Sequence, residues 1–245
     1  RILRRADADH VVRVYDNGET ESGTPYFVMS YADRGTVADL IALGRPSIEQ
    51  SLDIIRQAGA GLAVLHSHGI IHRDIKPQNL LLRSRPDGGT EVLVADLGVA
   101  KAVAHASGLT QVVGTPAYIA PEQALGQGLD IRADVHALGA VAYVLLTGRL
   151  VREDGIASLV AARLPPAPSQ VAEVPRRLDA PILKALAIDP AQRWPDIESF
   201  LAGLAAAQVE TAEAPPRRKV PLVALVLLVL LVTFAASYVV TALLR

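Results

Sequence analysis

The chain has 245 residues, with 24 Lys or Arg against 25 Asp or Glu, and it contains no cysteine. The absence of cysteine excludes a disulfide framework and any thiolate metal or redox site. A formal net charge of -1 provides no overall field that would attract nucleic acid, so no nucleic-acid partner is expected. The length suits one large domain with an additional segment.

The first predicted elements are two short strands. Residues 11–15 and 26–29 are rich in β-branched and aromatic side chains, and the turn signals Asn17-Gly18 and Gly23-Thr24-Pro25 separate them. This pattern predicts a hairpin.

A long helix follows. From Ser47 onward, apolar residues recur at steps of three and four, and Gln50 lies three residues after Ser47. The spacing predicts an amphipathic helix with Ser47 as its N-cap and its end near His68. His66 and His68 are interpreted as helix-end residues, because side chains two apart on a helix point in different directions and do not form a metal pair.

The rest of the chain before residue 208 alternates short apolar runs with helical patterns. Residues 79–83 and 91–95 flank a turn, and residues 131–147 are apolar on nearly every side, which is typical of a helix buried at the centre of a domain. Further helices are predicted at residues 177–187 and 195–207, the second with Pro195 in its first turn, and residues 165–168 are predicted to be loop.

The segment with the clearest chemistry reads His72-Arg73-Asp74-Ile75-Lys76-Pro77-Gln78-Asn79. It places a carboxylate, an ammonium group and an amide in one loop after a long helix. Phosphoryl transfer needs a carboxylate to orient the attacking hydroxyl, a cation beside the migrating group and a hard oxygen ligand for Mg²⁺. Asp74, Lys76 and Asn79 supply these groups, although the tripeptide His-Arg-Asp alone would be read as a polar turn.

Three further motifs follow in a fixed order. Asp96-Leu97-Gly98 comes after a predicted strand, Gly114-Thr115-Pro116-Ala117-Tyr118-Ile119-Ala120-Pro121-Glu122 comes next, and Asp134-Val135-His136-Ala137-Leu138-Gly139 opens the buried helix. With residues 72–79, this set resembles the protein kinase superfamily and in particular the bacterial membrane-anchored serine/threonine kinases. One position departs from the usual Asp-Phe-Gly pattern, where Leu97 replaces the Phe.

The resemblance covers residues 1–207 and implies an α+β, two-lobed fold. Residues 1–32 would be a partial N-lobe with the hinge, and residues 33–207 a complete, mainly helical C-lobe. The resemblance also implies roles for single residues: Asp74 as the catalytic base, Lys76 on the γ-phosphate, Asn79 and Asp96 on Mg²⁺ or Mn²⁺, Thr115 against the catalytic loop, Met29, Ser30 and Ala32 around the adenine of ATP, and Leu81 below it. Met29 can equally be interpreted as an ordinary core residue.

Other residues receive structural or regulatory roles from the same resemblance. His72 would pack in the core beneath the loop, Asp134 would have a structural role, and Glu122 would form a buried ion pair with Arg193. Arg73 and Lys101 would bind a phosphate on Thr110 or, second, Ser107. Lys76 and Gly114-Thr115 indicate specificity for Ser and Thr hydroxyls of protein substrates.

Three nucleotide-binding elements of the kinase pattern are not found in the sequence: the glycine-rich loop, the strand lysine and the helix glutamate. We therefore expect an N-terminally truncated piece of a longer protein, with little phosphoryl transfer on its own. A catalytically dead pseudokinase that acts as a membrane-anchored scaffold is the alternative. A small-molecule phosphotransferase is disfavoured, since such enzymes lack the motif at residues 114–122.

The C-terminal segment is predicted to cross a membrane. Residues 208–219 form a polar linker, and residues 220–244 carry no charge; as a helix they would reach about 37 Å, more than a bilayer core of roughly 30 Å. Arg217-Arg218-Lys219 precede the span and only Arg245 follows it, so the kinase domain is expected on the cytoplasmic side of an inner membrane. Ser237 and Thr241 form a weak small-residue stripe that is compatible with a homodimer.

Overall fold

The structure is a computed structural model, and it describes residues 9–96, 117–128, 130–152 and 163–213. Contacts divide the chain into two units, Arg1–Gln208 and Val209–Arg245. Several sequence predictions concern positions outside the described residues: Leu97, Gly98, Lys101, Ser107, Thr110, Gly114, Thr115, residues 214–219 of the linker, the membrane span at residues 220–244 with Ser237 and Thr241, and Arg245.

The predicted hairpin is confirmed, with two corrections. Strands β1 (Val14–Glu19) and β2 (Pro25–Met29) pair in antiparallel register, from Val14 opposite Met29 to Glu19 opposite Pro25. Asn17-Gly18 therefore lies inside β1 and does not form the turn. The chain reverses at Thr20–Thr24 instead, where Gly23 has a φ of 79°.

Val11 and Val12 do not belong to this hairpin. The Val12 N–H donates to the Val94 carbonyl at 2.9 Å, and the Val94 N–H donates to the His10 carbonyl at 2.8 Å. Both valines are buried, Val11 in the main core and Val12 in a small separate cluster with Leu93 and Ala95. Burial of apolar surface therefore outweighs the local strand pattern that linked them to β1.

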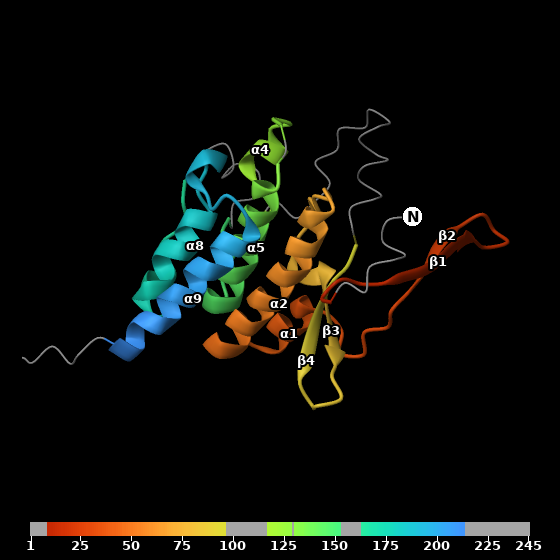
Figure 1. The fold of residues 1–245 in the computed structure, drawn as a ribbon, viewed down its shortest axis with the longest axis horizontal. Helices are drawn as coiled ribbons and strands as arrows, with labels where there is room; N and C mark the ends of the chain where they lie inside the picture. The colour runs from red at the N-terminus through yellow and green to blue at the C-terminus, as the bar shows by residue number, and fades with distance from the viewer. Residues whose placement is uncertain (1–8, 97–116, 129, 153–162, 214–245) are drawn as a thin grey trace, which may run out of the picture. The chain divides into compact units, whose positions relative to one another are not determined.

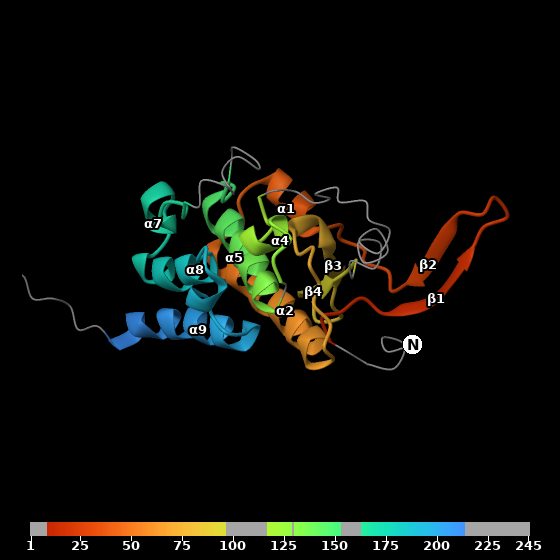
Figure 2. The ribbon, with the colours of Figure 1, turned by 90° about the horizontal axis from the view of Figure 1, so that it is seen from above.

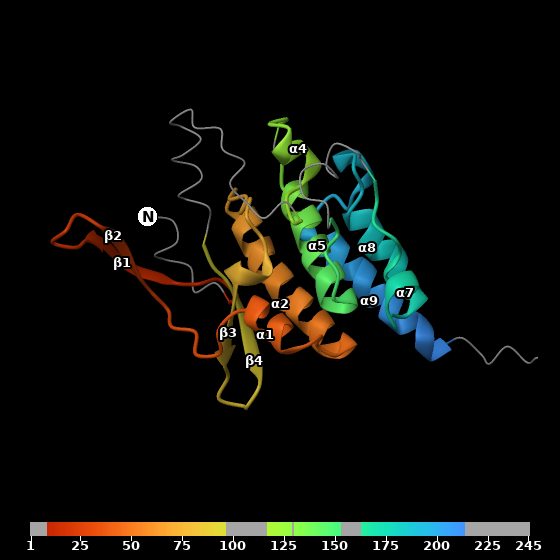
Figure 3. The same cartoon turned by 180° about the vertical axis from the view of Figure 1, so that it is seen from behind.

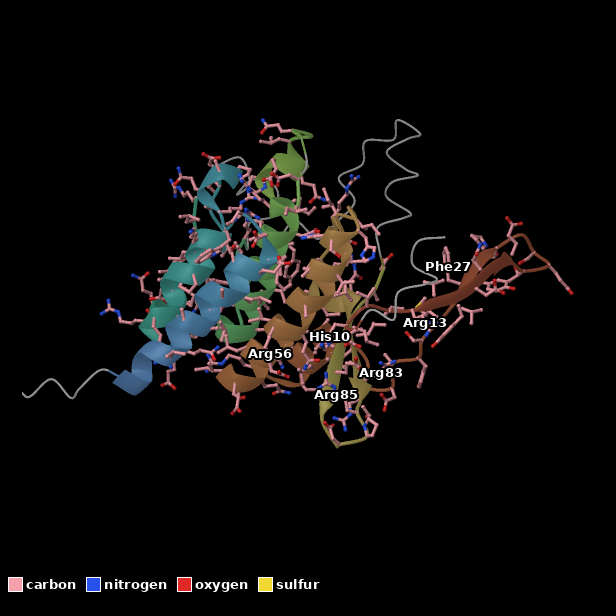
Figure 4. The ribbon with its side chains drawn as sticks, viewed as in Figure 1. His10, Arg13, Phe27, Arg56, Arg83 and Arg85 are labelled. Carbon is pink, nitrogen blue, oxygen red and sulfur yellow. The ribbon has the colours of Figure 1, made fainter. Side chains whose placement is uncertain are left out.

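The β1–β2 hairpin exposes most of its side chains. Figure 4 shows Phe27 on this hairpin and Arg13 just before it, both away from the helices. Phe27 is 58% exposed and Met29 is 46% exposed, so the interpretation of Met29 as an ordinary core residue is wrong. A two-stranded ribbon has little core of its own and is stable only when other elements support it.

Two capped helices follow the hairpin. In α1 (Val37–Leu43), Thr36 accepts from the Asp39 N–H, and the Asp39 carboxylate accepts from the Thr36 N–H at 2.8 Å, which forms a complete capping box. In α2 (Ile48–Ser67), Ser47 accepts from the Gln50 N–H at 3.1 Å, as the sequence predicts for its N-cap. The side of α2 that carries its apolar stripe is buried.

A second hairpin follows the segment at residues 72–79, which lies between it and α2. A 3-10 turn (Pro77–Asn79) leads into β3 (Leu80–Ser84), which pairs antiparallel with β4 (Thr90–Val94) around the predicted turn. Helix α2 packs against β4. The β3–β4 hairpin lies between the helices and the β1–β2 hairpin in both perpendicular views (Figures 1 and 2).

The centre of the helical part is α5 (Arg132–Thr147), which follows the short α4 (Pro121–Ala124). Every residue from Ala133 to Thr147 is buried, which confirms the prediction of a helix at the centre of a domain. Helix α5 lies between α2 and α8 (Asp179–Ala185), as Figures 1 and 3 show. Its position in the core explains why its sequence has no polar face.

The remaining elements are short, apart from the last helix. They are α7 (Pro168–Val171), the 3-10 turns Arg176–Leu178 and Pro190–Gln192, and α9 (Ile197–Glu213). Pro168 starts α7 and is not loop, and Pro195 precedes α9 instead of lying in its first turn; Asp196 caps the helix by accepting from the Ser199 N–H at 2.7 Å. Helix α9 continues six residues beyond Ala207 into the predicted linker.

Among the described residues, no helix is both long and apolar enough to cross a membrane.

Candidate active site

The Asp74 carboxylate lies at the centre of the loop between α2 and β3. Its Oδ2 is 3.0 Å from Lys76 Nζ and accepts from Asn79 Nδ2 at 3.2 Å. Asn79 Nδ2 also donates to the Asp74 carbonyl at 2.7 Å. The structure therefore brings together the carboxylate, the ammonium group and the amide that the sequence singles out, with the carboxylate oriented by the other two.

Two residues with oxygen donors suited to a divalent cation lie on adjacent segments beside this carboxylate. Asn79 uses its amide nitrogen for both bonds to Asp74, so its amide oxygen is not engaged in them. Asp96 follows β4 directly and is exposed, and the Ala95 N–H donates to the Asn79 carbonyl at 2.9 Å, so the two segments are adjacent. An amide oxygen and a carboxylate are the hard ligands that Mg²⁺ prefers, so this donor set fits the predicted ion.

The buried Asp134 of α5 holds the backbone of the loop. Its Oδ2 accepts from the His72 N–H at 2.8 Å and its Oδ1 from the Arg73 N–H at 2.9 Å. His66 Nε2 lies 2.8 Å from Oδ2 of the same carboxylate. The interpretation of His66 as a mere helix-end residue is therefore incomplete, since it supports the carboxylate that anchors the loop.

The buried His72 connects the two segments of the site. The Asp74 N–H donates to His72 Nδ1 at 3.3 Å, so Nδ1 acts as an acceptor. The other ring nitrogen, Nε2, then carries the proton and donates to the Ala95 carbonyl at 2.9 Å. His72 thus ties the loop at residues 72–79 to the residue before Asp96, in keeping with the structural role that the resemblance implies.

Both functional segments contain strained backbone. Arg73 has a φ of 68° and Asp96 a φ of 59°, in the left-handed region that residues with a Cβ rarely adopt. Such conformations cost about 1–3 kcal/mol each and persist only where surrounding contacts impose them. The strain lies next to Asp74 and at Asp96 itself, the two carboxylates assigned to chemistry.

The residues expected around adenine lie on two separate segments. Ser30 is buried and exchanges hydrogen bonds with Arg13, its N–H donating to the Arg13 carbonyl at 2.9 Å and its hydroxyl accepting from the Arg13 N–H at 3.1 Å. Leu81 packs in a small cluster with Val12. Met29 and Ala32 are more exposed than Ser30.

The expected pair of Glu122 and Arg193 forms a bidentate, buried ion pair. Arg193 Nη1 lies 2.6 Å from Glu122 Oε1, and Nη2 lies 2.7 Å from Oε2. The guanidinium also donates to the carbonyls of Ala187, Arg132 and Ile188. One side chain therefore joins α4, the start of α5 and the segment after α8.

A second buried cation, which the sequence interpretation missed, lies near this pair. Arg152 is buried and donates to the Ile119 carbonyl at 3.1 Å, and its Nη2 is 3.3 Å from His136 Nε2. Burial lowers the pKa of Arg152 to about 10, with Arg193 adding to the shift and Glu122 opposing it. No local pattern marks residues 136 and 152 as partners.

Burial, together with the nearby Arg193 and Arg152 guanidinium groups, holds the pKa of His136 well below its usual range. Because arginine can only donate, His136 Nε2 must be an acceptor and the neutral ring carries its proton on Nδ1. That atom is buried and has no hydrogen-bond partner among the described residues. His136 is therefore a neutral side chain in contact with the Arg152 cation.

Comparisons with known proteins agree with this geometry. The family model of the protein kinase domain matches residues 1–194. The serine/threonine-protein kinase PknB of Mycobacterium leprae (strain TN) is 36% identical over 232 residues, covering 86% of this chain and 35% of that protein. Pkn1, a serine/threonine-protein kinase of Myxococcus xanthus, is 38% identical over 232 residues, covering 90% of this chain and 33% of that protein.

Solved structures show the same fold. The kinase domain of Mycobacterium tuberculosis PknI superposes with a TM-score of 0.68 at 26% identity, covering 84% of this chain and 75% of that one. The chain spans only about a third of the length of the two curated relatives, at 35% and 33%.

Proposed function

Because the chain belongs to the protein kinase domain family, we propose that the protein transfers the γ-phosphoryl group of ATP to Ser and Thr hydroxyls of protein substrates. The observation that carries the proposal is the Asp74 carboxylate, held between Lys76 Nζ at 3.0 Å and the Asn79 amide at 3.2 Å, with Asp96 on the adjacent segment. The names of the relatives, which are serine/threonine-protein kinases, support the same hydroxyl specificity.

Bound ATP supplies the phosphoryl group, and bound Mg²⁺ neutralises the charge on its phosphates. In this proposal Asn79, through its amide oxygen, and Asp96 hold the ion. Asp74 accepts a hydrogen bond from the substrate hydroxyl and takes its proton as the hydroxyl oxygen attacks the γ-phosphorus, while the bond from that phosphorus to the β-phosphate oxygen breaks and ADP leaves. Lys76 carries the positive charge that offsets the charge of Asp74 and of the migrating group.

The hydrogen bonds from Asn79 hold the Asp74 carboxylate in position before any substrate binds. Asp74 needs no large movement, because Asn79 fixes both its carbonyl and its carboxylate. A general base that is positioned in this way contributes about 10²–10⁴-fold to the rate. Removing the carboxylate should therefore lower kcat by that factor and leave the fold intact.

The test uses an enzyme in which this chain is preceded by a glycine-rich loop and a strand lysine, the family's nucleotide-binding elements. Asp74→Asn and Asp96→Asn are compared with Asp87→Asn, a matched change in the β3–β4 turn. Transfer from labelled ATP to protein should fall at least a hundredfold in the first two and stay unchanged in the third. Near-parental turnover in Asp74→Asn, with an unchanged Tm, would show that the catalytic assignment is wrong.

We also propose that phosphorylation of Thr110, or second of Ser107, regulates the enzyme, with Arg73 and Lys101 as the receiving cations. The exposed side chain of Arg73, beside the catalytic carboxylate, supports this assignment. Mass-spectrometric peptide mapping of active enzyme should find phosphate on one of these two residues. Active enzyme with both residues unmodified contradicts the proposal.

Finally, we propose that residues 220–244 anchor the protein in a cell membrane, with the kinase domain on the cytoplasmic side. The charge bias of Arg217, Arg218 and Lys219 against Arg245 supports this orientation. ATP is cytoplasmic, so the cosubstrate requires the same side. A reporter that is active only outside the cytoplasm, fused after Arg245, should be active; a reporter active only inside would then be silent, and the opposite result overturns the orientation.

A further inference from the structure

The peptide group between Arg73 and Asp74 is held at both ends. Its N–H, on Asp74, donates to His72 Nδ1 at 3.3 Å. Its carbonyl, on Arg73, accepts from Gln123 Nε2 at 2.7 Å. The first contact comes from the catalytic loop itself, whereas the second comes from α4, fifty residues later in the chain.

The contact from Gln123 is made at a residue with a strained backbone conformation. Arg73 has a φ of 68°, so its local preference favours a different conformation. Asp134 holds the Arg73 N–H, and Gln123 holds the Arg73 carbonyl. These two side chains fix the peptide groups on either side of the strained residue, and the second of these groups leads directly into Asp74.

Gln123 is itself well anchored. It follows Glu122, whose carboxylate forms the buried bidentate pair with Arg193. Its own side chain is partly exposed, so the amide bridges from a fixed backbone across to the loop. A continuous series of contacts therefore runs from Arg193 through Glu122 and Gln123 to the carbonyl of Arg73.

We propose that Gln123 is a positioning residue for Asp74: its amide holds the Arg73 carbonyl and so sets the orientation from which the Asp74 carboxylate meets the substrate hydroxyl. This inference rests on the proposed phosphoryl transfer. Gln123 touches neither substrate nor cofactor and acts through the backbone. Gln123 directly follows Ala120-Pro121-Glu122, so its contact also joins the end of the 114–122 motif to the catalytic loop.

The test exploits the chemistry of the amide. Gln123→Glu keeps the shape of the side chain but cannot donate to a carbonyl while ionised, and it donates again when the carboxyl is protonated. In the enzyme with the nucleotide-binding elements, kcat should fall about ten- to a hundredfold near pH 8, with the KM for ATP unchanged. The ratio of variant to parent kcat should rise as the pH falls toward the ordinary glutamate pKa of about 4.3.

Two further variants separate positioning from general structural damage. Gln123→Leu has no donor at any pH, so its kcat ratio should be low and independent of pH. Gln127→Glu makes the same charge change at an exposed position four residues later and should keep a ratio near one. An unchanged kcat in Gln123→Glu, or a deficit that does not depend on pH, overturns the proposal.

A readout without activity keeps this inference separate from the proposed function. Amide hydrogen exchange of the peptide that covers residues 72–76 should be several-fold faster in Gln123→Leu than in the parent chain, and unchanged in Gln127→Glu. If the parent enzyme transfers no phosphoryl group, the proposed function fails, and the exchange result still decides the contact. Equal exchange in the parent and Gln123→Leu shows that Gln123 does not hold the loop.

Discussion

Replacing Arg193 by Met is expected to remove a large part of the stability of the helical part of the protein. Arg193 Nη1 and Nη2 lie 2.6 and 2.7 Å from the two oxygens of Glu122, and both side chains are almost fully buried, at 0% and 7% exposure. The substitution removes the cation but leaves the carboxylate in place. It also removes the three hydrogen bonds that the guanidinium donates to backbone carbonyls.

The magnitude follows from the burial of the pair. Removing one partner of a buried ion pair costs about 3–5 kcal/mol, because the remaining charge is left without compensation. Typical domains unfold with a free energy of about 5–15 kcal/mol, so Arg193→Met should bring the protein close to unfolding at room temperature. Replacing Glu122 by Met as well removes the stranded charge, so the double variant should be more stable than Arg193→Met alone.

Equilibrium unfolding in urea, followed by circular dichroism, measures this difference. The matched control is Arg83→Met, because Arg83 pairs with Glu91 at 2.7 Å but with 38% and 15% of the side chains exposed. An exposed pair is worth only about 0–1 kcal/mol. The reasoning is refuted if Arg193→Met and Arg83→Met lower the free energy of unfolding equally, or if the double variant is less stable than Arg193→Met.

Two other substitutions test the packing and the buried histidine. A Cβ on Gly61 would clash with the His10 carbonyl oxygen, so Gly61→Ala should lower the free energy of unfolding by about 1–3 kcal/mol in thermal denaturation. Gly128→Ala, in open space, should have no such effect. The pKa of His136 is about 6.5 when unfolded and lower when folded, so the unfolded state binds more protons between these values. The contribution of neutral His136 to the free energy of unfolding is therefore complete above about pH 6.5. It is lost as the pH falls below that value, by up to about 1.4 kcal/mol per pH unit until the folded pKa is reached. His136→Gln should flatten this part of the stability–pH curve, whereas the exposed His68→Gln should leave it unchanged; an equal slope in all three proteins contradicts the assignment.

Much of the fold and the chemical core of the site could be predicted from sequence because their signals are local. The period of apolar residues predicted α2 and its Ser47 cap, and the continuous apolar run predicted the buried α5. Asp74, Lys76 and Asn79 could be recognised because phosphoryl transfer requires them within one short loop. Because these residues share one loop, the 3-10 turn and the start of β3 set the distances between them.

Only the tertiary structure decided the contacts between distant segments. The pairing of Val11 and Val12 with Val94, the support of Asp134 by His66 and the approach of Arg152 to His136 each join residues that no periodicity relates. These partners are selected by burial and by the need to satisfy polar groups removed from water, which depend on how α2, α4 and α5 pack. Gln123 shows the same limit, since its amide acquires a role only where packing brings α4 against the strained carbonyl before Asp74.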